Sequence, residues 1–191
     1  MPIVQRPSEK EAMAAVRTLI AWAGDDPDRE GLIETPKRVA KAYREFFAGY
    51  DADLQKILGK TFEEVAGFED MVLMKNMRFE SHCEHHIAPI IGVCHIAYIP
   101  NKKVVGLSKM AHLLDAFAKR LQTQETMTSQ IAKAIEEYLD TKGVAVLIDA
   151  EHQCMTTRGA HKEGTTTITK TMLGNFRTDK DLEQKFLLLV K

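Results

Sequence analysis

Residues 87–100, IAPIIGVCHIAYIP, decide the fold. They are rich in isoleucine, valine and tyrosine, which fit the pleated surface of a sheet, so they predict a strand. Residues 72–80, just before them, predict another strand, and the chain changes from helical to extended character near Met71. The sequence therefore predicts a hairpin at this point.

A helix pair and a second hairpin are expected further along the chain. Apolar residues recur at helical spacing after Ser108, a plausible N-cap, and again over about 124–139. Residues 144–150 predict a strand buried on both faces, residues 165–172 predict another strand, and Asp179 is suited to cap a final helix. The order strand, strand, helix, helix, strand, strand predicts an α+β fold with the helix pair on one face of an antiparallel sheet.

The part of the chain before this sheet predicts helices. A capping box at residues 8–11 begins the first helix, and Gly24 can end it in a left-handed turn. Thr35-Pro36 suits the start of a second helix, with the threonine as N-cap. We expect an N-terminal helical segment over 1–70, ending in a short helix and a connection, and a catalytic α+β domain over 71–191. The two are expected to work as one compact functional unit.

Composition excludes several classes of protein. The 191 residues include 26 Lys+Arg against 27 Asp+Glu and are 45% hydrophobic, which argues against disorder and against a general nucleic-acid binder. The sequence contains no apolar run of about 18 residues and no N-terminal signal-peptide pattern, so no membrane partner is expected. Three cysteines cannot form a complete disulfide framework and favour a reducing, cytoplasmic location.

Two short segments combine cysteine and histidine: residues 81–86, SHCEHH, and residues 151–154, EHQC. The Cys-x-x-His spacing lets Cys83 and His86 reach one ion from a tight turn, and Cys154 on a neighbouring strand can complete the set. Three protein ligands leave a fourth zinc position for water, which is the catalytic arrangement. The spacing also occurs without a metal, so the pattern alone leaves both interpretations open.

Several histidines and Cys94 near these segments suit roles other than metal ligation. His85 and His152 suit acid–base groups beside such a site, because imidazole titrates near neutral pH. A rival metal site would use Cys94 and His95, but these residues are adjacent in a predicted strand and point to opposite faces, so they cannot easily bind the same ion. Cys94 is instead expected to be a small buried hydrophobe. His82 is expected to be solvated.

Neither glycine-rich phosphate loop, G-x-x-x-x-G-K-[ST] or G-x-G-x-x-G, occurs in the sequence. Ser108 and Lys109 at a predicted helix start offer an alternative anion site, and Arg38 and Lys41 lie one turn apart on another helix. Ordinary capping and solvated side chains explain the same residues, and the pattern alone favours that interpretation.

Several motifs together resemble the GTP cyclohydrolase I family in order and spacing, over roughly residues 10–190. They are WAGDDPDREGLIETPKRVAKAY (22–43), SHCEHH (81–86), AYIPNKKVVGLSK (97–109), QTQE (122–125), IDAEHQCM (148–155) and TRG (157–159). The resemblance implies conversion of GTP and water to 7,8-dihydroneopterin triphosphate and formate, the first step of tetrahydrofolate and pterin biosynthesis. The guanine imidazole ring is opened by hydrolysis, and the product is then rearranged and closed.

The resemblance also implies a role for each candidate residue. The implied metal ligands, for one Zn²⁺ per subunit, are Cys83, His86 and Cys154, and the implied catalytic residues are His152, His85 and Ser108. The implied substrate-binding residues are Glu125 and Gln124 at the guanine, and Lys109, Arg38, Lys41 and Arg158, together with Ser108, at the triphosphate and ribose.

The resemblance further implies the tunnelling fold and a toroidal homodecamer with active sites between subunits. One departure is His112, where the family commonly has an arginine that contacts the triphosphate; Lys119 or Arg120 is a possible compensating cation. Two alternatives remain open. One is a tunnelling-fold relative acting on another pterin or purine, and the other is a non-catalytic, zinc-stabilised assembly protein.

Overall fold

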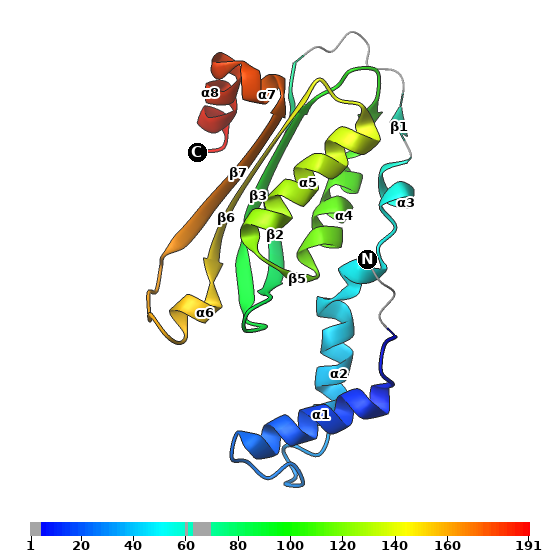
Figure 1. Ribbon diagram of the computed structural model, residues 1–191, viewed down its shortest axis with the longest axis vertical. Coiled ribbons are helices and arrows are strands. Elements are labelled where there is room, and N and C mark those ends of the chain that lie inside the picture. The colour runs from blue at the N-terminus through cyan, green and yellow to red at the C-terminus, as the bar shows by residue number, and fades with distance from the viewer. Residues whose placement is uncertain (1–4, 60, 63–69) are drawn as a thin grey trace. The chain divides into compact units, whose positions relative to one another are not determined.

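The computed structural model describes residues 5–59, 61–62 and 70–191 (Figure 1). The chain divides into two compact units, residues 1–47 and 48–191. The division expected at residues 70 and 71 follows the change from helix to strand, whereas the observed units divide earlier. The reason is that the short helices after residue 47 pack against a helix of the second unit. Most of the connection expected just before residue 70 lies outside the described residues.

The first unit contains helices α1 (Glu9–Trp22) and α2 (Thr35–Phe46). The predicted capping box is present in α1, and Gly24 has the predicted left-handed backbone with φ of 97°. Thr35 as the N-cap of α2 is wrong: the helix begins at Thr35, and Glu34 is the N-cap without a side-chain cap bond. The amide of Thr35 donates to the carbonyl of Leu32, so a turn already places the chain in helical conformation before Thr35.

The second unit is built around a five-stranded sheet. Its strands are β2 (Val72–Cys83), β3 (Pro89–Ile99), β5 (Leu121–Gln122), β6 (Gly143–His152) and β7 (Thr166–Gly174). The spatial order is β5-β2-β3-β6-β7. All neighbours are antiparallel except the two-residue β5, which pairs in parallel with the end of β2. The predicted antiparallel sheet is therefore confirmed, with one short parallel addition.

The other elements of this unit are short, apart from two long helices. They are η1 (Ala48–Asp51), α3 (Leu54–Leu58), β1 (Thr61–Phe62), β4 (Val104–Val105), α4 (Leu107–Ala118), α5 (Gln124–Leu139), α6 (Gln153–Thr156), α7 (Asn175–Thr178) and α8 (Lys180–Leu189). Strands β1 and β4 pair with each other. Asp179 caps α8 as predicted, accepting from the amides of Asp181 and Leu182.

Helices α4 and α5 lie side by side on one face of the sheet (Figure 1). Along β6, Val144, Val146 and Ile148 pack in the core under these helices, whereas Ala145 and Leu147 belong to a second apolar cluster. Phe176 of α7 and Phe186 of α8 complete that second cluster. The predicted α+β class, the helix pair on one face and the burial of β6 on both faces are confirmed.

The start of α4 differs from the prediction. Gly106 is the N-cap, with an extended backbone, and the helix begins at Leu107. The side chain of Ser108 therefore does not cap the helix and lies exposed in its first turn. In the described part of the chain, no helix combines the length and apolar character needed to cross a membrane.

Candidate functional site

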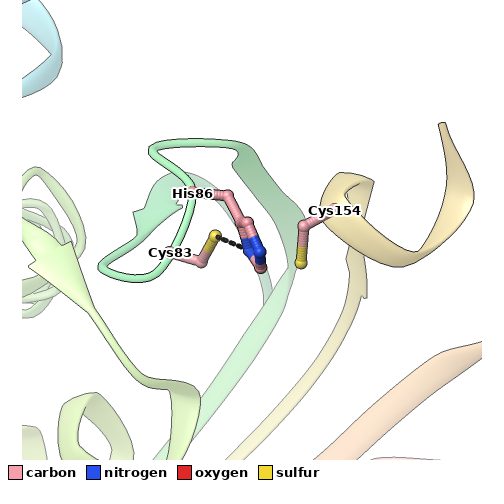
Figure 2. A group of neighbouring side chains, drawn as sticks. All are labelled: Cys83, His86 and Cys154. Atoms are coloured by element: carbon pink, nitrogen blue, oxygen red, sulfur yellow. Dashed lines mark hydrogen bonds between the residues drawn. The ribbon is translucent and has the colours of Figure 1, made fainter. Parts of the chain in front are cut away.

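Cys83, His86 and Cys154 converge at one end of the sheet (Figure 2). One thiol or imidazole ligand atom from each residue lies within 4.8 Å of the other two. The Sγ atom of Cys83 is 3.9 Å from Nδ1 of His86. Two thiols and an imidazole at this separation could share a single metal ion.

A tight connection between β2 and β3 positions the first two of these residues. The amide of Cys83 donates to the carbonyl of Ala88, and the amide of Ile87 donates back to the carbonyl of Cys83. Ile87 has φ of 53°, a left-handed backbone that is unusual for a β-branched residue. Such strain clusters at functional sites. The loop is thus folded tightly enough to place His86 over Cys83.

The register of the sheet brings the third residue to this loop. His152, the last residue of β6, lies opposite Ile90 of β3, close to where the β2–β3 loop ends. The chain then turns into the short helix α6, and Cys154 is its second residue. The end of β6 therefore delivers Cys154 to the side of Cys83 and His86.

The surroundings of the Cys154 thiol act on its pKa in both directions. Burial and the neighbouring Cys83 raise the pKa of the Cys154 thiol, while Arg158 acts in the opposite direction. Thiolate is the form that ligates metal, and a bound cation favours it strongly. A set of two cysteines and one histidine suits zinc, whereas magnesium and calcium prefer oxygen ligands.

His152 lies beside this group and is held by Gln124. Its Nε2 atom is 2.8 Å from Oε1 of Gln124, the first residue of α5. Burial lowers the pKa of His152, and the nearby Glu125 carboxylate acts to raise it. Glu125 itself is exposed in the first turn of α5. A half-buried imidazole, with an exposed carboxylate acting on it, therefore lies two residues before Cys154.

The chain is similar to known proteins over nearly its whole length. The sequence model of GTP cyclohydrolase I matches residues 12–191. The chain belongs to the GTP cyclohydrolase I family. A GTP cyclohydrolase 1 of Maricaulis maris is 62% identical over 97% of this chain and 91% of the relative. One from Allorhizobium ampelinum is 56% identical over 100% and 94%, respectively.

One solved structure, the apo form of an archaeosine synthase QueF-Like, aligns with 56% of this chain and 96% of its own. The sequence identity is 16% and the TM-score is 0.47.

The family resemblance stated from the motifs is thus confirmed, and the chain falls in a family of enzymes. Of the residues that the resemblance implied for catalysis and guanine binding, His85 lies next to His86, while Gln124 contacts His152 and Glu125 acts on it electrostatically. The ring of His85 is 6.2 Å from that of His86, and its Nε2 is 3.9 Å from the Glu84 carboxylate.

The implied triphosphate residues of the GTP cyclohydrolase I family are spread over several elements. Arg158 is exposed just after α6, and its charge acts on Cys154. Lys109 lies with Ser108 in the first turn of α4, where its amide donates to the Gly106 carbonyl. Arg38 and Lys41 are exposed on α2, in the other compact unit.

Two further predictions near the site have different outcomes. Cys94 is 0% exposed in the core under α4 and α5, and burial raises its pKa, so its assignment as a small buried hydrophobe is confirmed. The prediction that His82 is solvated is wrong. His82 is buried in β2 between Leu121 of β5 and Pro89 of β3, and burial lowers its pKa. A two-residue parallel strand leaves no recognisable sequence pattern, so this burial was not foreseen.

His112, which departs from the arginine common in the family, is exposed on α4 one turn after Ser108. It lines a hollow together with Asp115 and Lys119. Arg120 is engaged elsewhere: its Nε donates to the carbonyl of Gly49 at 3.1 Å, and its guanidinium lies over the ring of Phe117. Lys119 is therefore the better candidate for a compensating cation.

Proposed function

We propose that the chain converts GTP and water to 7,8-dihydroneopterin triphosphate and formate. The observation that carries this proposal is the Cys83–His86–Cys154 group next to His152, in a chain that the GTP cyclohydrolase I family matches over residues 12–191. Opening of the guanine imidazole ring needs an activated water and groups that move protons. The site supplies candidates for both within one cluster.

Zinc is the metal that we propose for this site, one per subunit, held by Cys83, His86 and Cys154. The support is the soft donor set, with two thiols and an imidazole within 4.8 Å of one another. Zinc with three protein ligands supplies Lewis acidity and activates water at neutral pH.

The surrounding side chains then divide the remaining work. His152 exchanges protons with the purine ring, and His85, exposed next to His86, assists at the ring and ribose. Glu125 accepts hydrogen bonds from the guanine N–H groups, since charged acceptors form the stronger bonds. Other exposed or half-buried polar residues bind the triphosphate and ribose; they are Ser108, Lys109, Arg158, Arg38 and Lys41.

A homo-oligomer, and specifically the toroidal decamer, is our proposal for the assembly. Strand β7 lies at one edge of the sheet, and at the other edge β5 covers only the last two residues of β2. Large apolar side chains are also exposed, including Trp22 at 86% and Ile168 at 62%. Pairing of such edges and burial of such side chains favour association. The cytoplasmic location and the absence of nucleic-acid and membrane partners stay predictions.

The assay that tests the activity uses the zinc-loaded protein and GTP. We expect formation of the fluorescent neopterin, measured after oxidation and dephosphorylation of the product. A relative specific for another pterin or purine would bind zinc and turn over its own substrate but not GTP. A zinc-stabilised assembly protein would turn over neither. An oligomeric, fully metal-loaded sample without GTP turnover would therefore contradict the proposal.

Changing His112 to arginine is expected to lower the KM for GTP, or at most leave it unchanged. The added cation stands one turn from Ser108 and can restore a triphosphate contact; one charge-assisted hydrogen bond of roughly 1 kcal/mol corresponds to about fivefold. The control is Ala111→Arg, which adds the same charge at the neighbouring exposed position of α4. Steady-state kinetics measure both. A clear rise in KM for His112→Arg alone would show that the histidine has a role of its own.

A further inference from the structure

The side chain of Gln124 is buried and forms hydrogen bonds with other residues of the chain. It is 1% exposed, although the residue stands at the start of α5 beside the exposed Glu125. The resemblance implied that Gln124 contacts guanine together with Glu125. In the structure the nitrogen of its amide contacts backbone carbonyls of β6 and β7, and the oxygen contacts His152.

The orientation of this amide is fixed by its neighbours. Nε2 of Gln124 lies 2.7 Å from the carbonyl oxygen of Thr167 and 3.2 Å from that of Ile148. Carbonyl oxygens only accept hydrogen bonds, so the atom facing them must be the nitrogen. The oxygen Oε1 is therefore the atom that faces Nε2 of His152 at 2.8 Å.

Two threonines close a ring around the same amide. Nε2 of Gln124 also lies 3.1 Å from the hydroxyl of Thr169, which is 2.7 Å from the hydroxyl of Thr128. Thr128 donates its one hydroxyl proton to the backbone carbonyl of Gln124 at 2.6 Å. Thr169 must then donate to Thr128 and turn a lone pair toward the amide nitrogen of Gln124, whose two protons are shared among Thr169 and the two carbonyls. A flipped amide would break this ring as well as the two carbonyl contacts.

We propose that Gln124 selects the tautomer of His152 that carries its proton on Nε2. An amide oxygen has no proton to give, so the short contact requires that the imidazole donates from Nε2. The neutral ring then keeps its free lone pair on Nδ1, and that atom is the one that exchanges protons with the substrate. Gln124 is thus a positioning residue that acts through His152. The inference rests on the proposed role of His152 as the acid–base group, and it leaves guanine recognition to Glu125.

The tautomer itself can be measured without any turnover. The full-length, zinc-loaded protein is labelled with ¹⁵N and ¹³C in histidine, and the His152 signals are identified by their loss in His152→Ala. Solid-state spectra are expected to show a protonated Nε2 and an unprotonated Nδ1 for His152, and Gln124→Met is expected to shift this population. A predominantly Nδ1-protonated ring in the unmodified protein would overturn the inference. Because no substrate is needed, that outcome is independent of whether GTP is the substrate.

Kinetics test the consequence for the reaction. Gln124→Met is expected to lower kcat about tenfold or more while KM for GTP stays within about threefold, because it disturbs proton transfer and not binding. The matched control is Gln130→Met on the same helix. Gln130 accepts a hydrogen bond from the Gln122 side chain, which also donates to the carbonyl of Phe117, so this variant should be close to the unmodified protein. In the His152→Ala background, Gln124→Met should have no further effect on kcat.

Two outcomes would contradict this role. A tenfold rise in KM with kcat unchanged would indicate that Gln124 contacts guanine directly, and a full effect in the His152→Ala background would show that it does not act through the imidazole. If Gln124→Met does not fold, a change at Thr169 tests the same hydrogen-bond network. Thr169 is half-buried in β7, and Thr169→Val removes the hydroxyl that contacts Thr128. It is expected to lower kcat in the same direction by a smaller factor, and Thr169→Ser, which keeps the hydroxyl, is expected to restore it. Unchanged kcat in Thr169→Val would overturn the proposal.

Discussion

Changing Cys154 to alanine is expected to remove zinc and enzymatic activity together. Cys154 is one of the three residues that form the proposed site, and its ligand atom lies within 4.8 Å of those of Cys83 and His86. Two remaining ligands bind zinc far more weakly; even the loss of a supporting residue behind a ligand typically costs about 10- to 100-fold in metal affinity. Elemental analysis of the purified variant should show well below one zinc per subunit, with neopterin formation lost in parallel.

The third cysteine provides the matched control for this experiment. Cys94 is fully buried in the middle of β3, among the apolar side chains under α4 and α5. Cys94→Ala also removes one thiol, but from a residue outside the proposed site, so zinc and turnover should be kept. Only the free energy of unfolding should fall, by roughly 1 kcal/mol. Retention of zinc in Cys154→Ala, or its loss in Cys94→Ala, would show that the ligand set is wrong.

The secondary structure was predictable wherever a pattern is local. The apolar run of β6 and the helical spacing along α4 and α5 are set by each segment's own period, and these elements lie where they were expected. The two expected N-caps at Thr35 and Ser108 failed for another reason. A cap depends on the turn that leads into the helix, and in both cases the preceding chain is already arranged so that an earlier residue takes the N-cap.

The candidate site likewise contains a part that local spacing predicts and a part that it does not. Cys83 and His86 share one short loop, and Cys154 follows a strand that was expected to lie nearby, so local spacing was enough to group them. The contact of Gln124 with His152 and Thr169 joins α5, β6 and β7. This contact depends on the register of two strands and on the position of the helix on the sheet. The local sequence of a single segment determines neither.

The second large effect is expected from His152→Ala, which should lower turnover strongly but leave zinc in place. Removing a general acid–base group typically costs about 10²- to 10⁴-fold in rate, so kcat should fall by that order. The imidazole faces Gln124, and His152 is not part of the Cys83–His86–Cys154 group, so the metal content should stay near one per subunit. Elemental analysis and the neopterin assay on the same sample separate the two effects.

His86→Ala is the control that distinguishes loss of a metal ligand from loss of an imidazole that does not bind the metal. It also removes one imidazole near the same loop, but from a residue within 4.8 Å of both thiols, and it should therefore lose zinc as well as activity. In His152→Ala the Oε1 atom of Gln124 also loses its donor, and a buried acceptor left unpaired costs about 1–3 kcal/mol, so a lower Tm with full zinc occupancy is expected. Loss of zinc from both variants would instead make His152 a ligand. In that case its Nε2 contact with Gln124 would orient a metal-bound ring and not a proton carrier.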